Sequence, residues 1–171
     1  MPDEPEEILY GRMKIDHAAA LGRAIATWAN FEFEVDEVIW ALARLEADQG
    51  ACLTAQYSTA AQRFDALLSL AALQGVNQIH IGKLNKVRDW ALAIAQKRNR
   101  IAHDPWFYGR ESDKHYRLHK TAKGKLDFKF KAVDEEELKA IESEFLDLTV
   151  RFQEVKHAML LDFYALPETP G

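Results

Sequence analysis

The sequence has few of the features that mark secreted, metal-binding or membrane proteins. Cys52 is its only cysteine, so no intramolecular disulfide can form and a thiolate metal site is disfavoured. No apolar run approaches the roughly 18 to 20 residues of a membrane helix. The acidic start, MPDEPEEILYGRM, lacks the basic and apolar segments of a signal peptide. We therefore expect a cytoplasmic protein that does not enter the membrane.

Several chemical motifs are also missing. The sequence has no glycine-rich phosphate loop and no serine in a nucleophile elbow. Four of its histidines, namely His80, His115, His119 and His157, show no metal-ligand spacing with acids on one helical face. The sequence thus predicts neither a metal ion nor a cofactor.

Positive charge is concentrated in one segment of an otherwise acidic chain. The net charge of −5 argues against a protein that coats nucleic acid. Residues 110–131, however, contain eight lysines and arginines but only three acidic residues. This segment therefore has a net charge of +5, and the rest of the chain has a net charge of −10. This basic segment is where we expect RNA to bind.

The 171 residues, 48% hydrophobic and 29% charged, suit one globular domain. We expect a mobile acidic arm over residues 1–14, a single helical domain over residues 15–165 and a flexible tail over residues 166–171.

Apolar residues spaced by three and four predict four long helices. The first covers about residues 15–47, with Gly50 as its stop signal. The second begins at Thr59, which has capping-box spacing with Gln62, and ends at Gly75. The third covers about residues 78–102, because Pro105 disfavours helix at the preceding residue. The last follows Asp134 and continues to about residue 164.

Between the third and last helices the apolar period changes from 3.6 to 2. Residues 116–119 and 126–132 alternate apolar and polar side chains around a turn at residues 122–125, which predicts a β-hairpin with one apolar and one basic face. The predicted fold is therefore all-α, an up-and-down bundle of four to five helices with a β-hairpin inserted at about residues 106–132.

Two helices carry a charge on their apolar stripe. Glu32 projects between apolar residues of the first helix, and Arg98 does so on the third. Because isolated buried charges are costly, we expect the two to meet. The pair either fixes helix register alone or holds Arg98 in place to bind a phosphate.

The third helix ends in a stretch dense in reactive groups, Arg98-Asn99-Arg100-Ile101-Ala102-His103-Asp104-Pro105-Trp106. His103 can exchange protons near neutral pH, and a helix C-terminus stabilises its cationic form. It is either a proton-transfer group or a helix-end histidine that bonds a terminal carbonyl.

Arg98-Asn99-Arg100-Ile101-Ala102-His103 resembles the arginine, four to six residues, histidine motif of HEPN domains (higher eukaryotes and prokaryotes nucleotide-binding), including the polar residue after the arginine. The Trp28-Ala29-Asn30-Phe31-Glu32 pattern on the first helix is also similar. HEPN domains are helical bundles with this motif near the end of a long helix.

The resemblance implies metal-independent RNA cleavage, as in the active members, at a cleft that two protomers share. His103 would then be the acid/base, Arg98 would hold the phosphate, and Asn99 would position backbone or substrate. Glu32 and Asp104 would support them. The leading hypothesis is a homodimeric endoribonuclease of toxin or defence type, with an antitoxin or nucleotidyltransferase-like partner. The alternative is a catalytically inactive HEPN-like binding module whose Arg98 and Glu32 network is structural.

The inserted hairpin offers an RNA track. The expected RNA-binding residues are Trp106, Arg110, Tyr116, Arg117 and Lys129, because basic grooves with aromatic side chains bind single strands. Alternatively, the lysines protect an exposed sheet edge from aggregation. On the first helix, Phe33 and Trp40 share a second face that either packs internally or forms a dimer contact.

Overall fold

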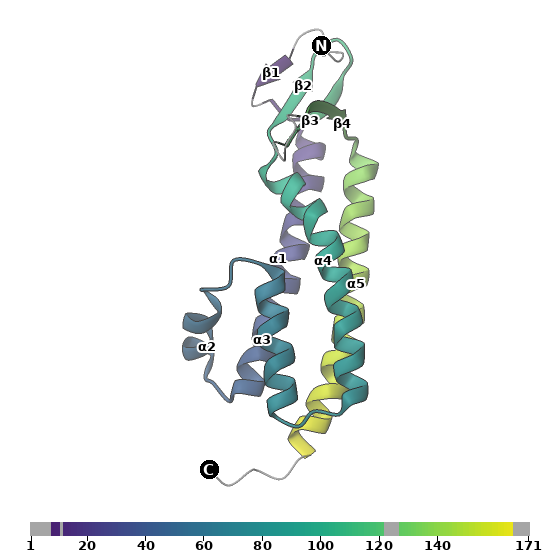
Figure 1. Ribbon diagram of the computed structural model, residues 1–171. Coiled ribbons are helices and arrows are strands. Elements are labelled where there is room, and N and C mark those ends of the chain that lie inside the picture. Colours follow the sequence, from purple (N-terminus) through teal and green to yellow (C-terminus); the bar gives the residue numbers. More distant parts are fainter. Residues whose placement is uncertain (1–7, 11, 122–126, 166–171) are drawn as a thin grey trace. The chain divides into compact units, whose positions relative to one another are not determined.

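The computed structural model describes residues 8–10, 12–121 and 127–165 (Figure 1). These residues form the helices α1 (Ile15–Ala43), α2 (Ala47–Thr54), α3 (Ala60–Leu73), α4 (Gln78–His103) and α5 (Glu135–Ala165). They also form the strands β1 (Ile8–Tyr10), β2 (Trp106–Gly109), β3 (Lys114–Thr121) and β4 (Asp127–Ala132). The predicted class, a helical bundle with an inserted hairpin, is confirmed.

The chain divides into two compact units. We call Met1–Trp28 with Gln96–Glu144 the sheet unit, and Ala29–Ala95 with Phe145–Gly171 the helical unit. All four strands belong to the sheet unit, and α2 and α3 belong to the helical unit. The helices α1, α4 and α5 each contribute residues to both units.

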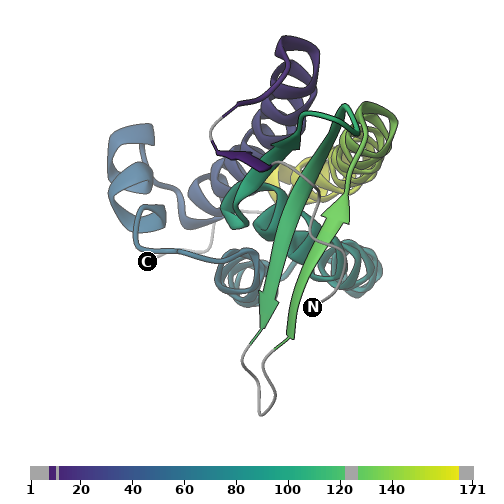
Figure 2. The same cartoon turned by 90° about the horizontal axis from the view of Figure 1, so that it is seen from above.

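The sheet is antiparallel throughout, in the order β1-β2-β3-β4 (Figure 2). The hairpin is confirmed as β3 and β4, paired from Tyr116 with Ala132 to Thr121 with Asp127. The turn predicted at residues 122–125 lies outside the described residues. Two strands were not predicted: β2 directly follows the end of α4, and β1 comes from the segment expected to be a mobile arm.

The two faces of the sheet differ in the way that the alternating pattern predicts. One face carries Phe107, 4% exposed, and Leu118, 7% exposed, with the Phe107 ring edge-on to Phe130. The other face carries His115 and Arg117, both buried. His115 contacts the start of α1 and Arg117 contacts the residue after α4, so the basic face is turned toward the helix ends of the same unit.

Three of the predicted helix signals are confirmed in atomic detail. The Thr59 hydroxyl accepts a hydrogen bond from the backbone N–H of Gln62 (3.2 Å) at the start of α3. Gly75 follows the end of α3 and has a φ of 72°. The Asp134 carboxylate accepts from the Glu137 amide (2.8 Å) and starts α5. Side-chain caps therefore fix where these elements begin.

The prediction that Gly50 ends a first helix reaching residue 47 is wrong. The helix α1 ends at Ala43, Arg44 has a φ of 54°, and Gly50 lies buried inside the short helix α2. A Cβ atom at Gly50 would lie 2.3 Å from Cγ of Trp40. The glycine is there because the indole needs its space.

The helical unit has an aromatic core. Phe31 of α1, Phe64 of α3 and Phe152 of α5 are fully buried, and their ring centroids lie 5.7–6.3 Å apart. Aromatic side chains contribute much of the burial energy of a core. In the described part of the chain, no helix combines the length and hydrophobicity needed to cross a membrane.

Candidate functional site

The end of α4 carries the predicted reactive residues. Arg98 is half-buried, and its Nη1 donates a hydrogen bond to Oδ1 of Asn99 (3.1 Å). Arg100 and His103 are exposed. His103 is the last residue of α4, so the imidazole lies at the helix C-terminus that Pro105 predicted.

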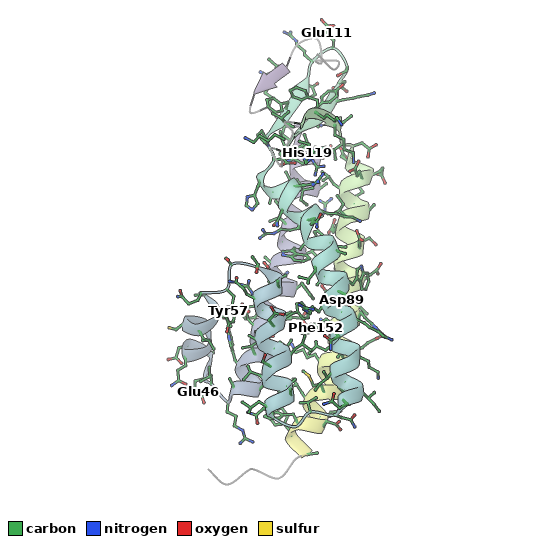
Figure 3. The ribbon with its side chains drawn as sticks, viewed as in Figure 1. Glu46, Tyr57, Asp89, Glu111, His119 and Phe152 are labelled. Carbon is green, nitrogen blue, oxygen red and sulfur yellow. The ribbon has the colours of Figure 1, made fainter. Side chains whose placement is uncertain are left out.

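Asp104 connects this helix end to the sheet. Its Oδ2 lies 3.5 Å from Nε of Arg117 and 3.8 Å from Nδ1 of His119 (His119 is labelled in Figure 3). The side chains of Asp104 and Arg117 are 18% and 8% exposed. The sequence predicted a supporting role for Asp104 but not its partners, because the pairing depends on how the hairpin folds back onto α4.

Trp106 closes the end of the helix. Its Nε1 donates to the Ile101 carbonyl (3.0 Å), and its ring lies edge-on to His17, with centroids 5.2 Å apart. One of the last helical carbonyls is thereby satisfied by a side chain. Trp106 is half-buried in this position, and its predicted stacking on an RNA base stays a prediction.

The predicted RNA-binding residues do not share one surface. Arg117 is 6% exposed, on the face turned toward the helix ends, whereas Tyr116 is on the opposite face. Burial lowers the pKa of the Arg117 guanidinium, and the nearby Asp104 carboxylate opposes this shift. Arg110 and Lys129 are exposed. Arg117 is therefore placed to hold Asp104, while RNA binding by the others stays a prediction.

Glu32 belongs to the helical unit and Arg98 to the sheet unit, so their pairing stays a prediction. Within its own unit, Glu32 lies 3.7 Å from Nη1 of Arg63, with 18% of its side chain exposed. Arg63 also donates through Nε to Asp36 (2.9 Å). Burial raises the pKa of Asp36, and Arg63 lowers it in turn.

Sequence reasoning missed Arg63. It lies on the first turns of α3, next to the buried Phe64, and its Nη1 also donates to the Tyr57 carbonyl (2.9 Å). Two carboxylates on the inner side of α1, Glu32 and Asp36, are spaced by four residues and therefore share a face. That spacing is the signal that predicts a buried cation opposite them.

Phe33 and Trp40 pack edge-on, with ring centroids 5.7 Å apart, but their other contacts differ. Trp40 packs on Gly50 and donates through Nε1 to the Thr54 hydroxyl (3.2 Å), so it is an internal contact of the helical unit. Phe33 is 53% exposed and lines a groove of about 770 Å³ along α1 and α5. The dimer contact predicted for this face thus depends on Phe33 rather than Trp40.

The chemistry available at the end of α4 is proton transfer and anion binding. An exposed imidazole can move protons, and a guanidinium binds a phosphate through its planar fork of donors. Among the described residues, no group of three or more His, Cys, Asp or Glu side chains could hold a metal ion. Comparison of this chain with family models, with curated proteins and with solved structures gives no match.

Proposed function

We propose that this chain is a HEPN-like endoribonuclease that cleaves RNA without a metal ion. The observation that carries the proposal is the position of His103, exposed at the C-terminus of α4 and five residues after Arg98. An imidazole there is open to a phosphodiester from solvent. The hydrogen bond from Arg98 Nη1 to Asn99 helps to orient the guanidinium at this end of α4.

The reaction would be an internal transesterification of RNA. A 2′-oxygen loses its proton to a base and attacks the adjacent phosphorus, the bond to the 5′-oxygen breaks, and an acid returns a proton to that oxygen. The products are a 2′,3′-cyclic phosphate and a 5′-hydroxyl. His103 would exchange the proton, which is worth about 10²–10⁴-fold in rate. Arg98 would bind the phosphate oxygens on which charge develops.

The proposal extends to the assembly. One chain offers one arginine and histidine pair, and a homodimer would bring two pairs to one cleft. Phe33 and the groove along α1 and α5 offer an apolar surface for such a contact. We place the protein in the cytoplasm, with an antitoxin or nucleotidyltransferase-like protein as its controlling partner.

The test is cleavage of labelled single-stranded RNA in EDTA by the full chain. Arg98→Ala and His103→Ala should each slow cleavage by about 100-fold or more. Arg100→Ala is the matched control, because it removes the same charge from an exposed position on the same helix, and it should stay within a few-fold of wild type. An RNA with a single 2′-deoxyribose at the cleavage position should not be cut there.

The proposal fails if wild type leaves the RNA intact, or if His103→Ala cleaves as fast as wild type. Light scattering coupled to size exclusion would measure the mass of the particle, and a monomer at the active concentration would contradict the shared cleft.

A second candidate function is a HEPN-like binding module without catalysis. The inward position of Arg117 favours it, because this arginine of the hairpin is used in an internal contact with Asp104. This candidate predicts that RNA or a partner protein binds without being cut and that His103→Ala leaves binding unchanged.

A further inference from the structure

A second histidine, His119 on β3, lies beside the end of α4. The Leu118 N–H donates to the Pro105 carbonyl (2.9 Å), so β3 passes directly beside the residues that follow the helix. His103 and His119 therefore flank Asp104. His103 is its neighbour in the sequence, and His119 is its neighbour in space, with 3.8 Å between Nδ1 and Oδ2 (Figure 3). All of these residues belong to the sheet unit.

The two nitrogens of the His119 ring have different surroundings. Nδ1 is closed off from solvent beside Oδ2 of Asp104, and neither atom has a hydrogen-bond partner within the described part of the chain. Nε2 is not a buried atom and makes no hydrogen bond to a described residue, and the side chain is 21% exposed. Of the two nitrogens, only Nε2 can therefore be reached by a substrate.

Asp104 determines which nitrogen of this ring carries the proton. A carboxylate only accepts hydrogen bonds, so a neutral imidazole satisfies both buried atoms when its proton is on Nδ1 and points at Oδ2. The distance of 3.8 Å is longer than a hydrogen bond, and catalytic contacts of this kind often tighten only when substrate binds. Nε2 is then the acceptor of the ring. A proton taken up there gives an imidazolium that the same carboxylate stabilises.

RNA cleavage by the 2′-hydroxyl moves two protons, and the two histidines suit different transfers. One proton leaves the attacking 2′-oxygen, and another arrives at the departing 5′-oxygen. His103 suits the second transfer, because the C-terminus of α4 stabilises the cationic form that donates. His119 suits the first transfer, because its accessible nitrogen is an acceptor and the carboxylate behind the ring favours the cation that forms.

We propose that His119 is the general base of the RNA cleavage proposed above and that Asp104 is its positioning residue. Nε2 of His119 takes the proton of the 2′-hydroxyl as the 2′-oxygen forms its bond to phosphorus. The bond from phosphorus to the 5′-oxygen breaks, and the His103 imidazolium gives its proton to that oxygen. Proton exchange with water returns both rings to their starting states. This assignment rests on the proposed function and gives each chain both a base and an acid.

An RNA in which sulfur replaces the departing 5′-oxygen separates the base from the acid, because a thiolate leaves without a proton. His103→Ala should slow cleavage of ordinary RNA by about 100-fold or more and return to within about 10-fold of wild type on the sulfur RNA. His119→Ala should lower kcat by about 100-fold or more on both RNAs, with KM changed by less than about 2-fold. Lys120→Ala is the matched control, since it changes the next, exposed residue of β3 on the opposite face, and it should stay within a few-fold of wild type.

Nuclear magnetic resonance of the imidazole nitrogens tests the role of Asp104 in the uncut protein. Long-range correlation of ring protons with ¹⁵N should show the neutral His119 of wild type with its proton on Nδ1. Asp104→Asn should move the proton toward Nε2 and slow cleavage of both RNAs by about 10-fold or more. Circular dichroism shows whether His119→Ala folds, and the proton position in wild type decides the question if it does not.

The outcomes distinguish this assignment from the proposed function. If wild type cuts RNA and His119→Ala cuts it within a few-fold of the wild-type rate, the assignment of His119 is overturned and the proposed function stands. Recovery of His119→Ala on the sulfur RNA would make His119 the acid and also overturn the assignment, as would a proton on Nε2 in wild type. If wild type leaves RNA intact, both are overturned.

Discussion

The imidazole rings of His17 and His115 lie face to face, with centroids 3.9 Å apart and planes 18° apart, in the interior of the sheet unit. His17 is on α1 and His115 on β3, so the stack joins the helix to the sheet. Because burial and the neighbouring ring disfavour a charge there, the contact is stable only while both rings are neutral.

The protein should therefore lose stability in mild acid. The pKa of His17 is about 4 in the folded chain and near 6.5 when unfolded, so the unfolded chain binds the proton first. The contribution of His17 to the free energy of unfolding is therefore fully present above about pH 6.5. It is lost as the pH falls toward 4, which lowers the free energy of unfolding by about 3 kcal/mol in total. Urea unfolding at several pH values measures the loss.

His17→Phe should flatten this pH dependence, whereas His157→Phe, at an exposed histidine of α5, should leave it unchanged. Equal slopes for wild type and His17→Phe between pH 6.5 and 4 would show that His17 is not the group responsible.

Gly50→Ala should destabilise the helical unit. The new Cβ would lie 2.3 Å from the Trp40 ring, and overpacking of this kind costs about 1–3 kcal/mol. Gly82→Ala is the matched control, since Gly82 is also inside a helix with nothing within 4 Å of an added Cβ. It should stabilise by about 0.5–1 kcal/mol. Thermal unfolding of both variants gives the comparison, and a harmless Gly50→Ala would refute the packing argument.

Arg63→Ala in α3 should lower the free energy of unfolding more than Arg88→Ala in α4. It leaves Glu32 and Asp36 without their shared cation, at about 3–5 kcal/mol for a broken buried pair. Arg88→Ala removes an exposed contact to Asp65 and should cost no more than about 1 kcal/mol. Chemical denaturation measures the free energy of unfolding of both variants. Similar losses of stability would mean that the contacts of Arg63 with Glu32 and Asp36 are not effectively buried.

Asp104→Ala should lower stability even without any role in catalysis. It leaves the buried Arg117 without its carboxylate, which we expect to cost about 2 kcal/mol, whereas Asp89→Ala, at an exposed site, should cost close to nothing. The double variant Asp104→Ala with Arg117→Met should recover part of the loss. If the stability change of the double variant equals the sum of the changes in the two single variants, the two side chains do not interact.

The long helices and the hairpin could be predicted because their signals are local. Thr59, Gly75 and Asp134 act within one turn of their own positions, and Pro105 acts on the residue before it. The alternating residues of β3 and β4 likewise need only their own spacing. These elements were located correctly to within a few residues.

Elements that depend on distant partners could not be predicted. The strand β1 has three residues and exists because β2 pairs with it. Gly50 looked like a stop signal because its neighbour Trp40 is ten residues away and their contact is invisible in the sequence. At the candidate site, Arg98 and His103 followed from spacing, whereas the contact of Arg117 with Asp104 required the fold.

Each of the two units contains two of the four tryptophans of the chain. Trp28 and Trp106 belong to the sheet unit, and Trp40 and Trp90 to the helical unit. Replacing either pair with phenylalanine leaves a chain whose tryptophan fluorescence, excited selectively over tyrosine, reports on one unit alone. Coincident denaturation curves from the two variants would mean a single cooperative transition, and separate curves would mean that one unit unfolds while the other persists.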